Sequence, residues 1–335
     1  MFYQQISAHL TAFTKRHCIP EMLLYHGKHF AWNLLFLLLR IICREPAPSE
    51  DPLVLKTKYF YPIQPLTKNI ICKLINRRKA DSHKGSYGHA LLIAGSRGKT
   101  GAAVIAAKAC LRSGAGLVTV CLPPEERAIL QIAVPEAMVL MQDEIKDLER
   151  FSAIGIGPGM GTDEAAKETL GKIIADAAVP LLLDADAITL LAADQPLFES
   201  LPSGTILTPH PKEFDRLFGE HEHDEARRMT AIKMAEDKNI VIVLKGYRTL
   251  ITSGGRSFIN STGNPGLAKG GSGDALTGII SSFLAQGYGP AIAAMIGVYL
   301  HGRAADIALK DQSPESMLIT DVIGCLGKAF KKIVS

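Results

Sequence analysis

The chain has 335 residues, with 37 Lys plus Arg against 33 Asp plus Glu, 47% hydrophobic residues and 21% charged ones. This balance is typical of a folded globular protein, and it argues against a disordered, collagen-like or membrane-embedded chain. The length suits one large α/β domain or two smaller ones. The net charge of +4 is uneven, because residues 1–80 carry 12 basic and 4 acidic side chains and the rest carry 25 and 29. We therefore expect the front of the chain to be an appendage.

The front of the chain contains one apolar stretch, residues 30–43. At about 14 residues, with Arg40 inside it, this stretch is shorter than the roughly 20 residues of a bilayer span. We favour a helix docked on the body, or a segment packed against a partner, over a helix lying on an anionic membrane surface. The stretch at residues 45–51, EPAPSED, reads as a linker. No signal-peptide cleavage site follows the apolar stretch, and the six cysteines include no CxxC pair, so we expect a cytoplasmic protein with no membrane partner.

From residue 89 onward, apolar runs of strand length alternate with helical segments. The runs are residues 90–94, 117–122, 153–156, 179–183, 205–207 and 240–244. The helical segments include residues 101–113, 163–177 and 224–237, and three more close the chain at 273–286, 290–309 and 320–333. Continuous apolar strands that alternate with helices predict an α/β fold with a mostly parallel, doubly wound sheet.

Polar or glycine-rich segments follow five of these predicted strands. They are residues 95–98, 155–161, 184–186, 208–211 and 245–249. Ligands of such sheets bind at the carboxyl ends of the strands, so we expect a ligand crevice there. GSRGKT at residues 95–100 is not a P-loop, because the glycine that a P-loop needs would fall at Ile93. GIGPGMG at residues 155–161 does not fit GxGxxG either, which leaves a dinucleotide dehydrogenase poorly supported.

The strongest signal is residues 260–274, NSTGNPGLAKGGSGD, which lead into a predicted helix. Five glycines in fifteen residues suit a turn whose bare N–H groups, at a helix N-terminus, hold a phosphate. Asp274 at the helix mouth is placed to accept a proton from an attacking hydroxyl. The aspartate alone could be only an N-cap, but the glycines, the aspartate and the helix together favour phosphoryl chemistry. We expect side chains added at Gly271 or Gly273 to harm activity more than stability.

These residues resemble a known family. GGSGD at residues 270–274 resembles the anion-hole and catalytic-base signature of the ribokinase-like superfamily, and NSTGNPGLAKGGSGDALTG resembles its ADP- or ATP-dependent NAD(P)H-hydrate dehydratase branch. Further matches follow in the family's order at residues 82–88, 101–103, 155–161, 183–187, 207–214 and 243–246. The resemblance implies a ribokinase-like three-layer α/β/α domain over residues 66–335, behind an N-terminal appendage and linker, residues 1–65, of unknown role.

The activity that the resemblance implies is a carbon–oxygen lyase that repairs nicotinamide cofactors. The S epimer of NAD(P)H hydrate is dehydrated to NAD(P)H while ADP yields AMP and phosphate, because phosphorylation makes the hydroxyl of the hydrate a good leaving group. ATP in place of ADP, and NADHX against NADPHX, stay open. One alternative is a kinase of the same superfamily that phosphorylates a small alcohol, such as a vitamin precursor or a sugar. Another is a nucleotide-sensing or scaffolding protein whose phosphate site no longer catalyses, which an intact Asp274 disfavours.

The resemblance also assigns roles to residues of this chain. Asp274 would be the catalytic base, and the hydrate would be bound by Ala102, Gly159, His210 and Asp274. From the local sequence alone, His210 is equally well explained as a helix cap. The nucleotide-binding residues would be Lys245, Gly246, Tyr247, Arg248, Thr249, Gly271, Ser272 and Gly273. Mg2+ is implied as a cofactor, with Glu213 as one candidate for placing it and no ligand set assigned.

The remaining expectations concern partners. Many relatives carry an epimerase domain before the dehydratase, and residues 1–65 are too short and too poorly patterned to be one. We therefore expect a separate epimerase, or spontaneous epimerisation, to supply the S form. The resemblance implies a homo-oligomer, often a tetramer. Nucleic acid is not expected as a partner, because the slightly acidic body has no basic patch with interleaved aromatic residues.

Overall fold

The computed structural model describes residues 62–145 and 147–334. They belong to a compact unit that extends over Tyr59–Ser335. The apolar stretch at residues 30–43 and the predicted linker lie outside the described residues. No helix in the described part of the chain has the length and apolar character to cross a bilayer.

One sheet runs through the described unit, with its strands in the order β1-β10-β9-β8-β7-β6-β5-β2-β3-β4. Seven neighbouring strands are parallel: β2 (His89–Ile93), β3 (Leu117–Cys121), β4 (Met138–Leu140), β5 (Ala153–Ile156), β6 (Leu181–Leu183), β7 (Ile206–Leu207) and β8 (Val241–Leu244). The strands β9 (Leu250–Ser253) and β10 (Arg256–Asn260) continue the sheet in antiparallel fashion, and β1 (Gln64–Leu66) pairs with β10 in parallel. The predicted mostly parallel sheet is confirmed.

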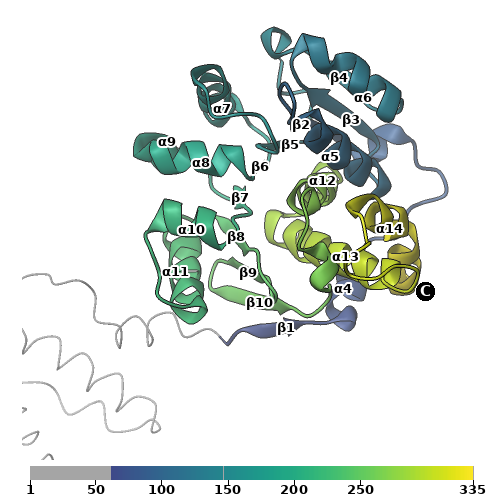
Figure 1. The fold of residues 1–335 in the computed structure, drawn as a ribbon, viewed down its shortest axis with the longest axis vertical. Helices are drawn as coiled ribbons and strands as arrows, with labels where there is room; N and C mark the ends of the chain where they lie inside the picture. Colours follow the sequence, from purple (N-terminus) through teal and green to yellow (C-terminus); the bar gives the residue numbers. More distant parts are fainter. Residues whose placement is uncertain (1–61, 146, 335) are drawn as a thin grey trace, which may run out of the picture. The chain divides into compact units, whose positions relative to one another are not determined.

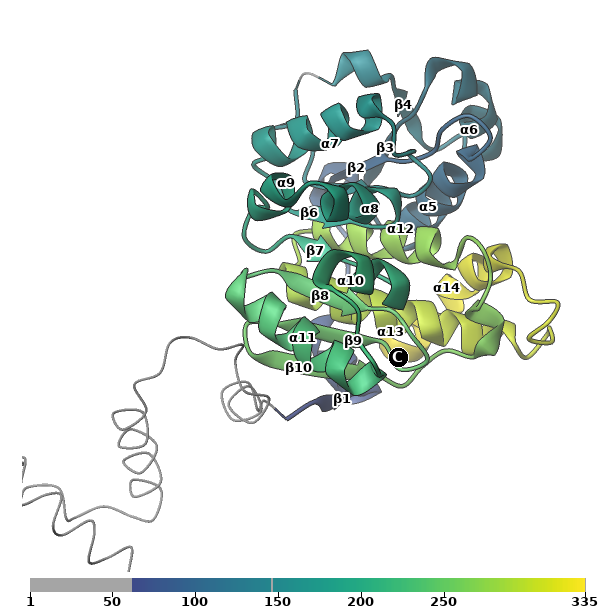
Figure 2. The same cartoon turned by 60° about the vertical axis from the view of Figure 1, so that its left-hand side comes forward.

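Helices cover both faces of this sheet (Figure 1). One layer contains α4 (Lys68–Leu74), α5 (Thr100–Arg112), α12 (Ser272–Ala285), α13 (Pro290–Ala308) and α14 (Ile319–Val334). The other layer, which comes forward in Figure 2, contains α7 (Glu164–Asp176), α8 (Asp186–Ala193), α9 (Gln195–Glu199), α10 (Pro211–Phe218) and α11 (Asp224–Asp237). A short helix, α6 (Arg127–Ala133), packs beside α5 and β4. The predicted three-layer α/β/α architecture is therefore confirmed.

The helix α12 lies at the centre of its layer. Its residues 275–285 are all buried, because the helix packs against β2 and β5 on one side and against α5 and α13 on others. A glycine lets α12 approach α5 closely, since a Cβ added at Gly278 would lie 2.1 Å from the carbonyl oxygen of Ala106. This packing fixes the N-terminus of α12, and with it Asp274, at the carboxyl edge of the sheet.

The predicted elements agree with the structure in order and kind. The bounds of β5 and α11 are those predicted, and the ends of the other predicted elements differ by up to two residues. The sequence did not indicate the hairpin of β9 and β10 or the edge strands β1 and β4. The strand β1 includes residues 64 and 65, so the sheet takes in two residues on the appendage side of the predicted boundary.

Candidate active site

A buried ion pair lies at the carboxyl edge of the sheet, below the N-terminus of α12. Asp184 follows β6 and is 1% exposed, and Lys245 follows β8. The Lys245 ammonium donates to Asp184 Oδ1 at 2.7 Å, and the Thr277 hydroxyl donates to Asp184 Oδ2 at 2.8 Å. A Cβ added at Gly273 would lie 3.4 Å from both Asp184 Oδ2 and Lys245 Nζ. The ends of two strands and the first turn of α12 therefore meet at one point.

This pair is charged in the folded protein. Burial alone would raise the pKa of Asp184, but the Lys245 ammonium and the hydroxyls of Thr208 and Thr277 outweigh burial and lower it. Burial would likewise lower the pKa of Lys245, but Asp184, Glu213 and Asp274 together raise it. Glu213 Oε2 lies 3.8 Å from Lys245 Nζ. One cation is thus surrounded by several carboxylates, and it holds the buried Asp184 ionised.

Asp274 lies in the first turn of α12, and its pKa is shifted in the opposite direction from that of Asp184. Burial, with a further contribution from the charge of Asp184, raises the pKa of Asp274 to about 6, although Lys245 acts in the opposite direction. A carboxylate with a pKa just below neutrality is ionised at pH 7 and still basic enough to take up a proton. These properties suit a general base.

The glycine-rich turn before Asp274 leaves the N-terminus of α12 open. No side chain within the described residues caps this helix, whose N-cap Gly271 has φ +91°. The N–H groups of a helix's first turn have no partner inside the helix and carry the positive end of its dipole. In this turn the N–H of Ser272 donates to Lys269 O at 3.4 Å. Binding of an anion by the N–H groups of residues 271–273 stays a prediction.

Gly271 and Gly273 differ in what an added side chain would meet. A Cβ at Gly271 would lie 2.7 Å from Ile105 Cδ1 and 3.0 Å from Ile319 Cγ2, in a backbone conformation that side chains rarely adopt. A side chain at Gly271 should therefore cost stability as well as activity, and the expectation that activity suffers more stays a prediction. At Gly273 the expectation stays a prediction, since a Cβ there makes only ordinary contacts over the ion pair.

Two further strand ends complete this edge of the sheet. A Cβ added at Gly159, after β5, would lie 3.1 Å from the Cβ of Ala102, so these two predicted hydrate-site residues are neighbours. Asp186 accepts from the N–H of Gly161 at 2.9 Å and lies 3.4 Å from the Lys99 ammonium.

The backbone between Asp184 and Asp186 is strained. The residue between them, Ala185, has φ +48° and ψ −116°, a conformation that costs a non-glycine residue about 1–3 kcal/mol. Asp184 bonds to Lys245 and Thr277, whereas Asp186 bonds to Gly161 and Lys99. The strained residue thus gives two nearby carboxylates separate sets of partners.

His210 is the N-cap of α10. Its Nδ1 accepts from the backbone N–H of Lys212 at 3.1 Å and of Glu213 at 3.2 Å, and Glu213 Oε2 accepts from the N–H of His210 at 2.8 Å. The helix-cap interpretation is therefore confirmed. The ring remains 47% exposed, with Nε2 at 3.3 Å from Glu213 Oε1. Contact with a ligand through this outer face of the ring stays a prediction.

The predicted nucleotide segment, residues 245–249, forms the turn between β8 and β9. The N–H of Lys245 donates to Pro209 O at 2.9 Å, and the N–H of Asn260 donates to Thr249 O at 2.9 Å, which fixes both ends of the turn. Between them Tyr247 is 92% exposed, with the Arg248 guanidinium 5.7 Å from its ring centre. An aromatic ring and a cation at the rim are suited to stacking against a base and attracting phosphate.

Thr277, Lys99 and His301 lie near these groups but were not singled out in the sequence. Thr277 stands four residues after Gly273 on α12, so helical spacing could have placed it on the same face. His301 of α13 is buried, and its Nε2 has no hydrogen-bond partner among the described residues. Burial, with the charge of Lys245, lowers the pKa of His301 to about 4, so this histidine is neutral. No local pattern distinguishes it from a core histidine.

The carboxylates at this edge form no cage for a metal. Within residues 62–145 and 147–334, no group of three His, Cys, Asp or Glu side chains is arranged to hold an ion. Asp184 already uses both oxygens, on Lys245 and Thr277. Mg2+ in nucleotide enzymes keeps several waters and binds one or two carboxylates plus phosphates. The residues therefore fit a Mg2+ ion that arrives with a nucleotide better than a resident one.

Comparison with known proteins assigns this arrangement to a family. A family model described as NAD(P)H-hydrate dehydratase matches residues 90–327. The chain belongs to the NAD(P)H-hydrate dehydratase family. Its fold is similar to the crystal structure of the ADP/ATP-dependent NAD(P)H-hydrate dehydratase from Bacillus subtilis, co-crystallized with ATP/Mg2+, with a TM-score of 0.73 and 32% identity over 81% of this chain and 99% of that one. The predicted ribokinase-like fold is thereby confirmed.

Curated relatives of this dehydratase family are similar over most of the chain. The ADP-dependent (S)-NAD(P)H-hydrate dehydratase of Lactiplantibacillus plantarum is 39% identical over 252 residues, which cover 73% of this chain and 89% of that protein. The bifunctional NAD(P)H-hydrate repair enzyme Nnr of Moorella thermoacetica is 38% identical over 274 residues, 77% of this chain and 52% of that protein. The chain spans about half the length of the bifunctional relatives that it matches.

Removing the cation of the buried pair should destabilise the fold. We expect Lys245→Met to lower the free energy of unfolding by about 3–5 kcal/mol, because Asp184 is left buried without its counter-ion. The double variant Lys245→Met with Asp184→Asn should recover at least half of that loss, since an amide at position 184 needs no counter-ion. Urea denaturation measures both values. Equal losses in the single and double variants would contradict the role of the pair.

The raised pKa of Asp274 predicts a pH-dependent stability. Because the folded state holds this proton more tightly than the unfolded state, the contribution of Asp274 to stability falls as pH rises through about 4 to 6. Asp274→Asn should therefore be more stable than the unsubstituted protein at pH 8, and the difference should shrink toward pH 4. Thermal or urea denaturation over that range tests it, and a constant difference between the two proteins would contradict the shift.

Proposed function

We propose that this chain dehydrates the S epimer of NAD(P)H hydrate to NAD(P)H, with ADP converted to AMP and phosphate. The observation that carries the proposal is the position of Asp274, a base with a pKa of about 6, in the open first turn of α12 above the Asp184–Lys245 pair. Family membership and the similarity to the ADP-dependent (S)-NAD(P)H-hydrate dehydratase of Lactiplantibacillus plantarum support the same reaction.

In the proposed mechanism Asp274 removes the proton from the hydroxyl of the hydrate. The hydroxyl oxygen then forms a bond to the terminal phosphorus of ADP, and the bond from that phosphorus to the bridging oxygen breaks to release AMP. Loss of phosphate, together with a proton from the neighbouring carbon, leaves the ring double bond of NAD(P)H. Proton removal by a positioned base contributes about 10²–10⁴-fold to such a rate.

The phosphoryl group would lie on the glycine-rich turn. Gly271, Ser272 and Gly273 would hold the phosphoryl group at the positive end of α12, where the helix dipole favours the charge that spreads over the phosphoryl oxygens during transfer. The N–H of Ser272, which donates to Lys269 O at 3.4 Å, would exchange that partner for the anion. Lys245 supplies a cation next to Gly273, where an added Cβ would be 3.4 Å from its ammonium. Asp184 keeps that ammonium in position.

The substrates would bind on either side of this turn. We assign the nucleotide to residues 245–249, where Tyr247 and Arg248 offer an aromatic ring and a cation at the rim. The hydrate would contact Ala102 and Gly159, which are neighbours, and the outer face of the His210 ring. A Mg2+ ion bound to the phosphates would neutralise part of their charge. Glu213, whose Oε2 lies 3.8 Å from Lys245 Nζ, would help to place this ion. A reaction rate that chelation with EDTA does not alter would contradict the Mg2+ assignment.

A small-alcohol kinase is the second candidate, because the same base and anion site would phosphorylate a vitamin precursor or a sugar. The long glycine-rich segment at residues 260–274 favours the dehydratase, as does the similarity to two ADP-dependent (S)-NAD(P)H-hydrate dehydratases. The two reactions differ in the fate of the phosphorylated alcohol, which a kinase releases intact and a dehydratase breaks down.

We further propose how the protein works in the cell. Residues 66–335 would carry the dehydratase activity alone, with residues 1–65 as an appendage that the reaction does not need. The R epimer would then remain until a separate epimerase converts it. Direct conversion of purified R epimer by this chain would contradict the proposal. We assign the enzyme to the cytoplasm, where its cofactor substrates are found, and fractionation of cells that express it would test this.

We propose that the chain forms a homo-oligomer, with a tetramer as the expected form. An apolar patch at one edge of the sheet supports self-association. Ile129 and Ile132 on α6 are 49% and 83% exposed, and Met138 on the edge strand β4 is 42% exposed. Unpaired strand edges with exposed apolar side chains commonly mark contacts between subunits. A monomer in sedimentation experiments at micromolar concentration would contradict this assignment.

The reaction is tested by following NADH absorbance with NADHX, ADP and Mg2+. Asp274→Asn should lower turnover by at least about 10²-fold, because the base is lost, while ADP binding measured by calorimetry remains. In the unsubstituted enzyme the acid limb of kcat/KM should have an apparent pKa near 6, since Asp274 must be ionised to accept the proton.

The matched control is Asp176→Asn. Asp176 is an exposed carboxylate in the last turn of α7, at the other end of that helix from the catalytic edge. This variant should keep full turnover and the same pH profile. Equal turnover in Asp274→Asn and Asp176→Asn would overturn the role of Asp274.

A further inference from the structure

A large cavity lies at the opposite edge of the sheet from the catalytic residues. It has a volume of about 1080 Å³ and is lined by the segment before β2, the end of α5, the ends of α12 and α14, and Tyr288. Pockets of about 300–1,000 Å³ hold ligands the size of cofactors. Asp274 and Gln286 stand at the two ends of α12, about 18 Å apart along the helix axis. A ligand in this cavity would therefore not compete with one at the catalytic edge.

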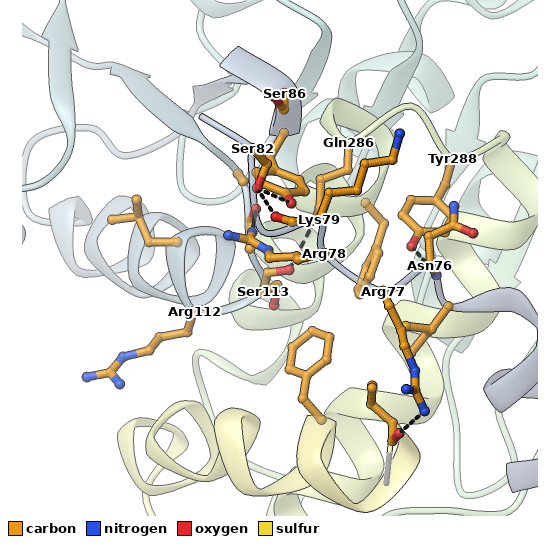
Figure 3. Close-up of a pocket in the computed structure, with 18 of the residues that line it drawn as sticks. Asn76, Arg77, Arg78, Lys79, Ser82, Ser86, Arg112, Ser113, Gln286 and Tyr288 are labelled. Atoms are coloured by element: carbon orange, nitrogen blue, oxygen red, sulfur yellow. Dashed lines mark hydrogen bonds between the residues drawn. The ribbon is translucent and has the colours of Figure 1, made fainter. Parts of the chain in front are cut away.

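The charge of the cavity lining is strongly positive. Its basic side chains are Arg77, Arg78, Lys79 and Arg112, and its one acidic side chain is Asp81. None of the four cations forms an ion pair with a carboxylate in the described part of the chain. In Figure 3 the first three leave one segment in different directions, and Arg112 extends away from that segment, from the last turn of α5.

Two of these arginines are held in place by neutral groups. The guanidinium of Arg78 donates to the carbonyl oxygen of Gly114 and lies 3.8 Å from the ring centre of Tyr87. The guanidinium of Arg77 donates to Val334 O at 3.0 Å. Since carbonyls and a ring leave the positive charge unneutralised, both cations keep their attraction for an anion.

The rest of the lining combines polar and apolar groups, as ligand sites commonly do. The hydroxyl of Tyr87 donates to Ser82 Oγ at 2.7 Å. The lining also contains three aromatic rings, with the ring centre of Phe283 5.4 Å from that of Tyr288 and 6.1 Å from that of Phe330. The hydroxyl of Ser113, another lining residue, is buried and has no hydrogen-bond partner among the described residues. An anion with an apolar body would meet both kinds of surface.

The wall of the cavity includes a segment that resembles the family and has no role in the proposed reaction. Residues 82–88 contain the short helix η1 (Lys84–Tyr87), which forms part of the wall. A Cβ at Gly88 would lie 1.8 Å from Ala285 O, and a Cβ at Gly116 would lie 1.7 Å from Lys84 O. These close approaches hold the wall against the end of α12 and the start of β3.

We propose that this cavity is a second ligand site, which binds a phosphate-bearing metabolite with an apolar group, of nucleotide size. The combined positive charge of the lining attracts the phosphate, and the apolar group lies against Tyr288 and Phe330. The site is separate from the dehydratase reaction and does not depend on it. Binding is electrostatic in its main part, so it weakens as ionic strength rises.

Calorimetric titration of the full chain with inorganic pyrophosphate tests the site. The cavity variant is Lys79→Gln with Arg112→Gln, two exposed side chains on different walls whose charged groups hold no other element in place. Its matched control is Arg256→Gln with Lys328→Gln. Arg256 is exposed on β10, and Lys328 precedes the cavity residue Phe330 by two positions on α14 and so faces away from the cavity.

We expect the unsubstituted protein and the control variant to bind one pyrophosphate per chain in this cavity, with equal affinity. The cavity variant should bind it at least about tenfold more weakly, because two of the four positive charges of the lining are lost. Its unfolding midpoint and its dehydratase turnover should not change. If the double variant fails to fold, Lys79→Gln alone, on an exposed turn, should weaken binding by at least about threefold.

Identical isotherms for all three proteins would overturn the proposal. So would a cavity variant whose only change is a smaller sedimentation coefficient, because that result would make the cavity a contact between copies of the chain. Loss of pyrophosphate binding in Gly273→Ala, with binding kept in the cavity variant, would assign the anion to the catalytic turn and would also overturn it.

Discussion

The contact between Asp184 and Lys245 is the interaction on which the rest of the catalytic edge depends. Asp184 is deeply buried, and an ionised carboxylate in that position is stable only because an ammonium lies 2.7 Å away. The pair joins the ends of β6 and β8, and Thr277 joins it to α12. The charge of Asp184 in turn helps to raise the pKa of Asp274, so one buried pair sets both the position of the cation and the strength of the base.

The packing of helix α12 holds this arrangement in place. Its first turn is open to solvent, uncapped and rich in glycine, whereas residues 275–285 are buried. The close approach to α5 at Gly278 leaves the helix little freedom to shift. An anion at its N-terminus is therefore met by donors that are already in place, which is the condition under which such donors stabilise a transition state well.

The sequence predicted the parts of the fold that follow from local patterns. Apolar runs such as residues 153–156 are buried on both faces, so their composition alone indicates a parallel strand. The hairpin of β9 and β10 was missed because its residues mix polar and apolar side chains around a short turn. Thr277 was missed because it bonds to a residue 93 positions away in the chain. His301 was missed because its sequence context is that of any buried helix residue. His210 illustrates the limit, since the structure confirms that its ring caps α10, whereas its contact with the hydrate stays a prediction.

In the reaction proposed for this enzyme, Asp274 and the first turn of α12 promote transfer of a phosphoryl group from ADP to the hydrate, and that group is then lost as phosphate. Phosphorus NMR of the enzyme with ADP, Mg2+ and the S epimer of NADHX, read together with NADH absorbance, tests it most directly. We expect one AMP and one phosphate for each NADH formed, and none of the three with Asp274→Asn. NADH formed while ADP is unchanged, or a phosphorylated alcohol that accumulates without NADH, would contradict it.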